Sequence, residues 1–189
     1  MNKILFFVVV ICLVDIFIFL FVPDSSLYTF SLDSFLREPW RLFTFQFFHI
    51  NIFHLLENAI GFIFIALIAT ELEIDLKSFL FIYFLATFIV ILPILYVFPH
   101  EIVAGGSTGI YGVLALCLIK ARKLISLKIT LPVVIISIFS LSIFNFILCD
   151  MCFVPFFKTE FFHLIGFISG VTLSIEPREG IAYSIQCLY

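Results

Sequence analysis

The chain has 189 residues, of which 63% are hydrophobic and 12% charged, and its formal net charge is −3. The charged fraction is about half that of an average soluble domain, and the mean hydropathy of +1.28 agrees with it. This composition indicates an integral membrane protein. It excludes the basic surface of a nucleic-acid-binding protein and a polybasic lipid-binding tract, so membrane components are the expected partners.

Six apolar segments approach the roughly 20 residues that a helix needs to cross a bilayer core. They cover about residues 4–22, 50–70, 78–98, 105–119, 127–149 and 161–175, and the fourth and sixth are short. None has the alternating pattern of a membrane β-barrel. We therefore predict an all-α polytopic membrane protein with six transmembrane helices, forming a single membrane domain over residues 1–189.

The first apolar run follows Lys3 and could be a signal peptide or a retained helix. It is longer than the 7–15 residues typical of a signal-peptide core and leads into "FVPDSS" rather than a small-residue cleavage site, which favours the retained helix. Asp15 within it is costly at depth. We expect this side chain to face a neighbouring helix or a watery cavity.

The distribution of lysine and arginine predicts the orientation, because short cytoplasmic loops are enriched in these residues. With the N-terminus inside, seven lie on the inner side and three on the outer: Lys3, Lys77, Lys120, Arg122, Lys123, Lys128 and Arg178 against Arg37, Arg41 and Lys158. Both chain ends are thus predicted to be cytoplasmic, in a plasma or inner membrane. The tail after about residue 176 is expected to lie along the membrane surface.

The outer first loop, about residues 23–49, is the longest outer connection. Its "EPWRLFTF" stretch, with Trp40 and Arg41 among aromatic residues, predicts a segment lying at the membrane interface. Cys149 and Cys152 have the C-x-x-C spacing of redox or metal motifs. Without a second pair, the preferred interpretation is that cysteines in these apolar segments act as small hydrophobic residues, and no cofactor or metal is expected.

Polar residues from three predicted spans meet at one depth on the outer side. The second span carries His49, His54 and Asn58 in its outer part, and the last two are four residues apart on one helical face. The fourth span begins outside with Ser107 in its first turn, and the sixth places His163 near its outer end. A single intramembrane histidine is nonspecific as to role, and an asparagine is often interhelical glue, but their coincidence favours a functional site.

Glycines surround the serine in "AGGSTGIYG". Gly105 and Gly106 allow the non-helical backbone needed to begin a helix below the surface, and the first turn of that helix offers unpaired N–H groups. Further along, Gly109 with Gly112 and Gly166 with Gly170 permit the fourth and sixth helices to approach closely. A packing face of small residues is the alternative interpretation of these glycines.

A serine hydroxyl becomes a nucleophile when a base takes its proton, and histidine is the usual base near neutral pH. His163 could act as that base for Ser107. An oxyanion formed by attack on a peptide carbonyl could be stabilised by His54, Asn58 and the Ser107 amide. The residues alone therefore predict a serine nucleophile activated by a histidine, with donors for an oxyanion beside it.

These residues resemble the rhomboid family of intramembrane serine proteases. "GGSTGIYG" is similar to the family's G-x-S-x motif, "HINIFHLLEN" to its His-x4-His-x3-Asn pattern, "HLIGFISG" to its H-x-x-G-x-x-x-G motif and "PWR" to the Trp-Arg of its first loop. The resemblance covers about residues 39–170, with three motifs in the family's order.

The resemblance implies a Ser107–His163 dyad without a catalytic aspartate, His54 and Asn58 as oxyanion donors, and Tyr111 packed against His163. It also implies that Trp40 and Arg41 shape the first loop, and that the substrates are transmembrane segments of other proteins. Thr108 follows the serine where glycine is common, and Glu57 stands where an apolar residue is more typical. The substrate, the oligomeric state and the role of Glu57 are not given by the sequence.

Two other functions compete with this one. A catalytically inactive relative would bind transmembrane clients, but such relatives typically lack the serine or the histidine, and this chain has both. A metalloprotease or metal transporter could use His49, His54, Glu57 and His163, although no H-E-x-x-H motif is present. We therefore expect a serine endopeptidase that needs no metal.

Overall fold

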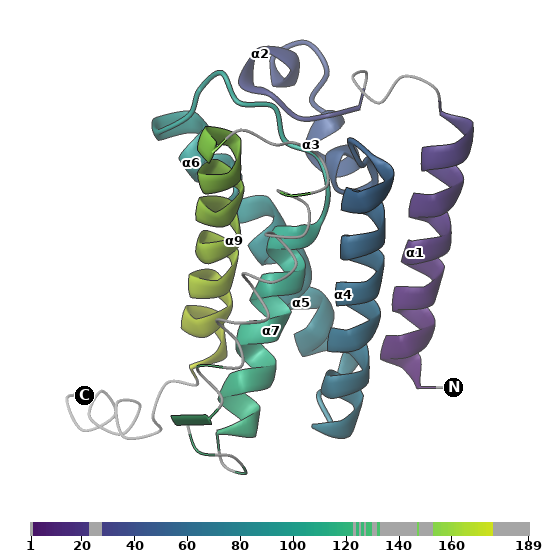
Figure 1. Ribbon diagram of the computed structural model, residues 1–189, viewed down its shortest axis with the longest axis vertical. Coiled ribbons are helices and arrows are strands. Elements are labelled where there is room, and N and C mark those ends of the chain that lie inside the picture. The colour runs from purple at the N-terminus through teal and green to yellow at the C-terminus, as the bar shows by residue number, and fades with distance from the viewer. Residues whose placement is uncertain are drawn as a thin grey trace, which may run out of the picture.

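The computed structural model describes residues 2–22, 28–122 and 153–175, with isolated positions between 124 and 147, and these form a helical bundle (Figure 1). The long helices are α1 (Lys3–Phe21), α4 (Ile52–Glu71), α5 (Leu76–Ile89), α7 (Ser107–Ala121) and α9 (Phe153–Ser174). The short ones are α2 (Leu32–Phe35), α3 (Arg41–Thr44), the 3-10 turn η2 (Phe45–Phe47) and α6 (Ile91–Tyr96). Most of the predicted fifth span, Cys149 and Cys152, and the C-terminal tail lie outside the described residues.

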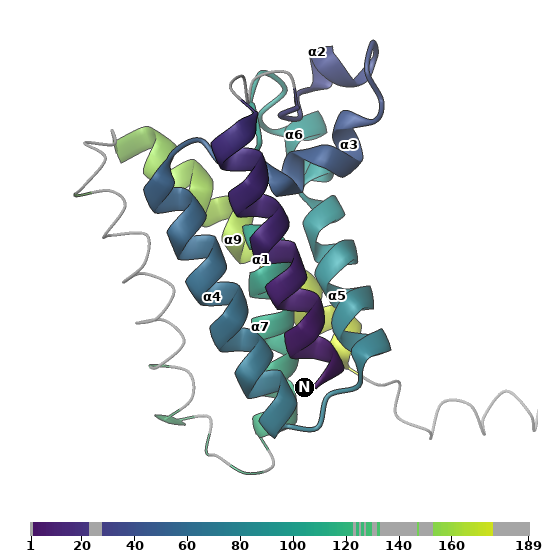
Figure 2. The ribbon, with the colours of Figure 1, turned by 90° about the vertical axis from the view of Figure 1, so that its right-hand side faces the viewer.

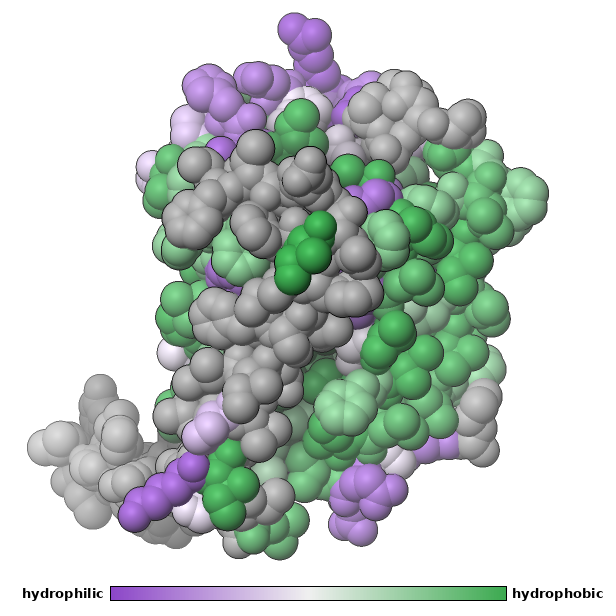
Figure 3. Space-filling model, in the orientation of Figure 1, coloured by the Kyte–Doolittle hydropathy of each residue, from purple (hydrophilic) through white to green (hydrophobic). Residues whose placement is uncertain are grey.

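Three helical stretches of the described chain are long and apolar enough to cross a membrane: Lys3–Phe21, Ile52–Glu71 and Leu76–Ile94. Helix α7 is apolar but has only 15 residues, a length of about 22 Å at roughly 1.5 Å per residue. Apolar side chains cover the face formed by α1 and α4, and hydrophilic residues gather at its two ends (Figure 3). The predicted all-helical membrane fold is thus confirmed for these residues, while the count of six spans stays a prediction.

The two ends of the bundle differ. Helix α1 begins and α9 ends at the lower end of the view in Figure 1, whereas α2, α3 and α6 lie at the upper end. Helix α7 begins well below the upper ends of α1, α4 and α9, and the chain from α6 descends to reach it (Figure 1). Helix α7 thus starts inside the bundle rather than at its upper end, and the depth of this start in the membrane stays a prediction.

The core forms where α1, α4, α5 and α7 meet. Phe62, Phe79 and Val113 are buried there together with Val8 of α1. Helix α1 lies beside α4 and α5 (Figure 2). Asp15 of α1 is also buried, at 7% exposure, as expected for a carboxyl group that faces neighbouring helices. A second cluster joins the first loop to the helices below it and contains Phe30, Phe45, Val90, Ile94 and Phe162.

Two helices differ in extent from the predicted spans. The sixth span was expected to begin near residue 161, but α9 begins at Phe153. The polar residues Lys158 and Glu160 therefore lie inside the helix. Pro155 is tolerated in the first turn, because a backbone N–H there has no partner within the helix. The third span was expected as one segment over 78–98. One apolar helical stretch, Leu76–Ile94, covers most of this span, with a turn at Val90 that divides it into α5 and α6. Pro93 lies just beyond this turn, where its ring cannot continue a regular hydrogen-bond ladder.

Candidate active site

Ser107 is the first residue of α7, and the chain before it is held by backbone hydrogen bonds. Phe30 and Val103 pair as an isolated antiparallel bridge, with N–O distances of 2.9 and 2.8 Å. The Gly105 N–H donates to the Phe45 carbonyl at 2.9 Å. The first loop therefore fixes where α7 begins.

Gly105 adopts φ +92°, a conformation that side-chain-bearing residues rarely take. A methyl group there would also lie 2.9 Å from Cε1 of His54. At Gly106, the N-cap residue, a methyl group would overlap the Tyr83 hydroxyl. Both glycines are thus needed, as predicted, and no side chain of the described residues caps α7 at Gly106.

His163 lies on α9 and is buried at 8% exposure. Its Nε2 is 3.0 Å from Oγ of Ser107, a residue 56 positions earlier in the chain. This is a hydrogen-bond distance. The structure thus brings together the two residues that the sequence singled out, on two different helices.

The close packing of α7 against α9 depends on glycine. A methyl group at Gly166 would lie 2.9 Å from the carbonyl carbon of Thr108, and one at Gly170 would lie 2.7 Å from that of Gly112. Both distances are shorter than carbon–carbon contact. The backbones of the two helices therefore touch, which places His163 beside the first turn of α7.

Tyr111 lies one turn after Ser107 and is buried. Its ring stacks on the imidazole of His163, with centroids 4.2 Å apart and an interplanar angle of 27°. The stacking limits rotation of the imidazole. Tyr111 thus packs where the resemblance implied.

His54 and Asn58 lie on one face of α4, beside the turn that precedes Ser107. A methyl group at Gly105 would lie 3.0 Å from Nε2 of His54 and 3.5 Å from Nδ2 of Asn58. One N–H of the Asn58 amide donates to the His54 carbonyl at 2.9 Å, and a primary amide carries a second N–H. Both side chains therefore adjoin the glycine turn that leads to the serine.

His49 was expected in the outer part of the second span, but it lies before α4, which begins at Ile52 after an Asn51 cap. The helix begins there because the Asn51 side chain accepts a hydrogen bond from the His54 N–H at 2.8 Å. His49 is buried, and its ring meets that of His54 edge to face at 5.0 Å. Burial lowers the pKa of His49 to about 4, so the ring is neutral at pH 7.

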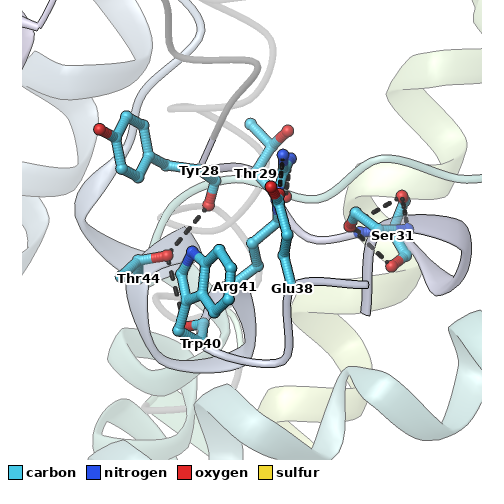
Figure 4. Close-up of polar contacts among 8 residues, drawn as sticks. Tyr28, Thr29, Ser31, Glu38, Trp40, Arg41 and Thr44 are labelled. Carbon is cyan, nitrogen blue, oxygen red and sulfur yellow. Dashed lines mark hydrogen bonds and ion pairs between the residues drawn. The ribbon is translucent and has the colours of Figure 1, made fainter. Parts of the chain in front are cut away.

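Trp40 and Arg41 belong to the first loop, whose polar contacts appear in Figure 4. Arg41 forms an ion pair with Glu38 and donates to the Thr29 carbonyl at 3.3 Å. The Trp40 side chain is 52% exposed, while the backbone carbonyl of Trp40 accepts from Thr44. Both residues thus act in the loop rather than beside Ser107.

Glu160 is a residue near the site that the sequence reasoning missed. Its Oε1 lies 3.6 Å from Nδ1 of His163, and both side chains are about nine-tenths buried. The available signal was its position three residues before His163, on the same helical face. Within the described residues, no group of three or more His, Cys, Asp or Glu residues could hold a metal ion.

These features define a helical membrane protein in which a serine at the start of one short helix contacts a histidine on another. The chain belongs to the rhomboid family, because the family model for the Rhomboid domain matches residues 36–176. Members of that family are generally intramembrane serine proteases, and inactive members exist. The comparison with curated proteins gives no match, and neither does the comparison with solved structures.

Proposed function

We propose that this chain is an active intramembrane serine protease, a single membrane domain that cleaves peptide bonds in or near transmembrane segments of other proteins. The observation that supports this most directly is the 3.0 Å contact between Ser107 Oγ and His163 Nε2. Ser107 acts as the nucleophile and His163 as the general base. An inactive relative that only binds clients would have no need of this contact.

The reaction proceeds in two halves. The Ser107 hydroxyl attacks the scissile carbonyl carbon while its proton passes to His163 Nε2, and the carbonyl oxygen becomes an oxyanion. The imidazolium then gives the proton to the leaving amine, and an acyl-enzyme remains on Ser107. A water molecule, deprotonated by His163, attacks this ester; the C–O bond to Ser107 breaks, the imidazolium returns its proton to Ser107 Oγ, and the new carboxyl terminus leaves.

The oxyanion would form near the N-terminus of α7, next to the glycine turn. The backbone N–H groups of the first turn have no partner within the helix and point beyond its N-terminus, where the positive end of the helix dipole lies. The His54 and Asn58 side chains adjoin the same turn. We assign them, with the Ser107 amide, to stabilising the negative charge on the oxygen.

The test is cleavage of a model single-span substrate in liposomes, together with labelling by a fluorophosphonate probe. Wild type should cleave and be labelled, whereas Ser107→Ala and His163→Ala should do neither. Ser169→Ala is the matched control, because this buried serine donates to the carbonyl of Ile165 in its own helix at 2.7 Å. Full proteolysis by Ser107→Ala would refute the assignment, and a wild type that binds the substrate without cleaving it would favour the inactive relative.

A further inference from the structure

Two buried polar atoms face one another on α9. Glu160 Oε1 and His163 Nδ1 lie 3.6 Å apart, with side-chain exposures of 11% and 10%. Within the part of the chain that the structure describes, neither atom has a hydrogen-bond partner. Since buried polar groups are nearly always hydrogen-bonded, both atoms call for an explanation.

The two atoms satisfy each other if they approach slightly. A charge-assisted N–H···O hydrogen bond has a length of about 2.7–2.9 Å, so the gap must close by less than about 1 Å. A glutamate side chain has three rotatable bonds and can make this shift without moving the helix. His163 is held more firmly, because it stacks on Tyr111 and contacts Ser107.

We propose that Glu160 is a positioning residue for His163 in this chain, a carboxylate that lies behind the Ser107–His163 dyad and orients its imidazole. The Glu160 carboxylate accepts a hydrogen bond from Nδ1–H of His163. Neutral imidazole carries one N–H, and therefore Nε2 is left as the acceptor that faces Ser107. The proton of the serine then has an unprotonated nitrogen to move to, and no oxidant or co-reactant is needed.

The same carboxylate stabilises the imidazolium that forms after proton transfer, because opposite charges attract strongly away from water. Among the described residues, Tyr111 of α7 stacks on the imidazole, and His54 of α4 also lies near His163. Lys158, two residues before Glu160, forms an ion pair with Glu101 of the α6–α7 connection. Its ammonium group is therefore engaged elsewhere.

The experiment compares Glu160→Gln with Glu101→Gln, which removes one carboxylate from the same end of the bundle without touching His163. Glu160→Gln should lower kcat at least about 10-fold, below the roughly 10⁴-fold found when the acid of a complete triad is replaced by its amide. Its KM should stay unchanged, because Glu160 acts on His163 and not on the substrate. Glu101→Gln should behave as wild type in both kcat and KM.

A second measurement does not depend on catalysis. Only four histidines occur in the chain, so ¹⁵N-histidine NMR in detergent can assign His163 by the signal lost in a His163→Gln variant. The wild-type spectrum should show the Nδ1–H tautomer, and Glu160→Ala should lose it. An Nε2–H tautomer in wild type would overturn the inference, even where a Glu160 variant fails to fold.

The inference rests on the proposed function, but the two fail differently. Wild-type kcat in Glu160→Gln, beside an inactive Ser107→Ala, would refute the positioning role of Glu160 and leave the protease intact. A wild type that neither cleaves nor reacts with the fluorophosphonate would refute the protease, while the tautomer would still test the hydrogen bond.

Discussion

The glycine contact between α7 and α9 makes a quantitative prediction for Gly166→Ala. The new methyl carbon would lie 2.9 Å from the carbonyl carbon of Thr108, whereas carbon atoms pack at about 3.5–4.0 Å. The two helices must therefore separate by roughly 1 Å at this level. Gly166 is three residues after His163, so a similar displacement should reach the catalytic pair.

A separation of that size would carry the Ser107 Oγ to His163 Nε2 distance from 3.0 Å to about 4 Å, which is too long for a hydrogen bond. A misplacement of about 1 Å can cost on the order of 100-fold in rate. Overpacking of a tight interface costs typically about 1–3 kcal/mol of stability. We therefore expect Gly166→Ala to fold, with a lower melting temperature, and to lose most of its activity.

The assay is turnover of a single-span substrate in liposomes, with the melting temperature measured in detergent. Gly61→Ala is the matched control, because a methyl group at Gly61 of α4 would meet only Ile110 Cγ2, at an ordinary 3.9 Å. It should change neither quantity appreciably. A Gly166→Ala protein with wild-type turnover would refute the argument that backbone contact between α7 and α9 sets the catalytic distance.

Three further predictions concern other parts of the site. Asn58→Ala should lower turnover by about 10²–10³-fold and leave residual activity, because one oxyanion donor is lost. Unfolding returns the pKa of His49 from about 4 to about 6.5, so the unfolded chain binds more protons below that pH. Stability should then be complete above about pH 6.5 and fall by up to about 3 kcal/mol as the pH approaches 4, and melting curves of His49→Gln should lack this part of the slope. Cleavage should persist in a chelator such as EDTA, and its loss there would support the metalloprotease alternative instead.

The sequence predicted the helices best where hydropathy and capping act together. Helix α4 runs from Ile52 to Glu71 against an expected 50–70, since an apolar run follows the Asn51 cap and these local signals decide its start. The fourth span was predicted from residue 105 with Ser107 in its first turn, whereas α7 begins at Ser107 itself, because Gly105 adopts a positive φ that a regular helix does not contain. The contact of Ser107 with His163 was expected from their shared depth, and the structure places the two within hydrogen-bond distance.

The sequence did worse where tertiary contacts decide. A hydropathy window ends a span at Lys158 and Glu160, yet α9 includes both, because each finds a polar neighbour: Lys158 pairs with Glu101 of a distant segment, and Glu160 lies beside His163. No sequence pattern gives the pairing of Lys158 with a residue 57 positions away. The role assigned to Glu160 was missed for a different reason: its spacing of three residues to His163 was available, but the predicted sixth span began after it, near residue 161.

The two catalytic side chains are supported by different kinds of interaction, and this should govern which substitutions each tolerates. Ser107 is placed by backbone hydrogen bonds, between Phe30 and Val103 and from Gly105 to Phe45. Because main-chain atoms form these bonds, apolar exchanges at Phe30 or Val103 can preserve the start of α7. His163 is placed by the absence of side chains at Gly166 and Gly170, where every other residue adds a Cβ that meets the backbone of α7. Tolerance should therefore be broad in the first loop and narrow on this face of α9.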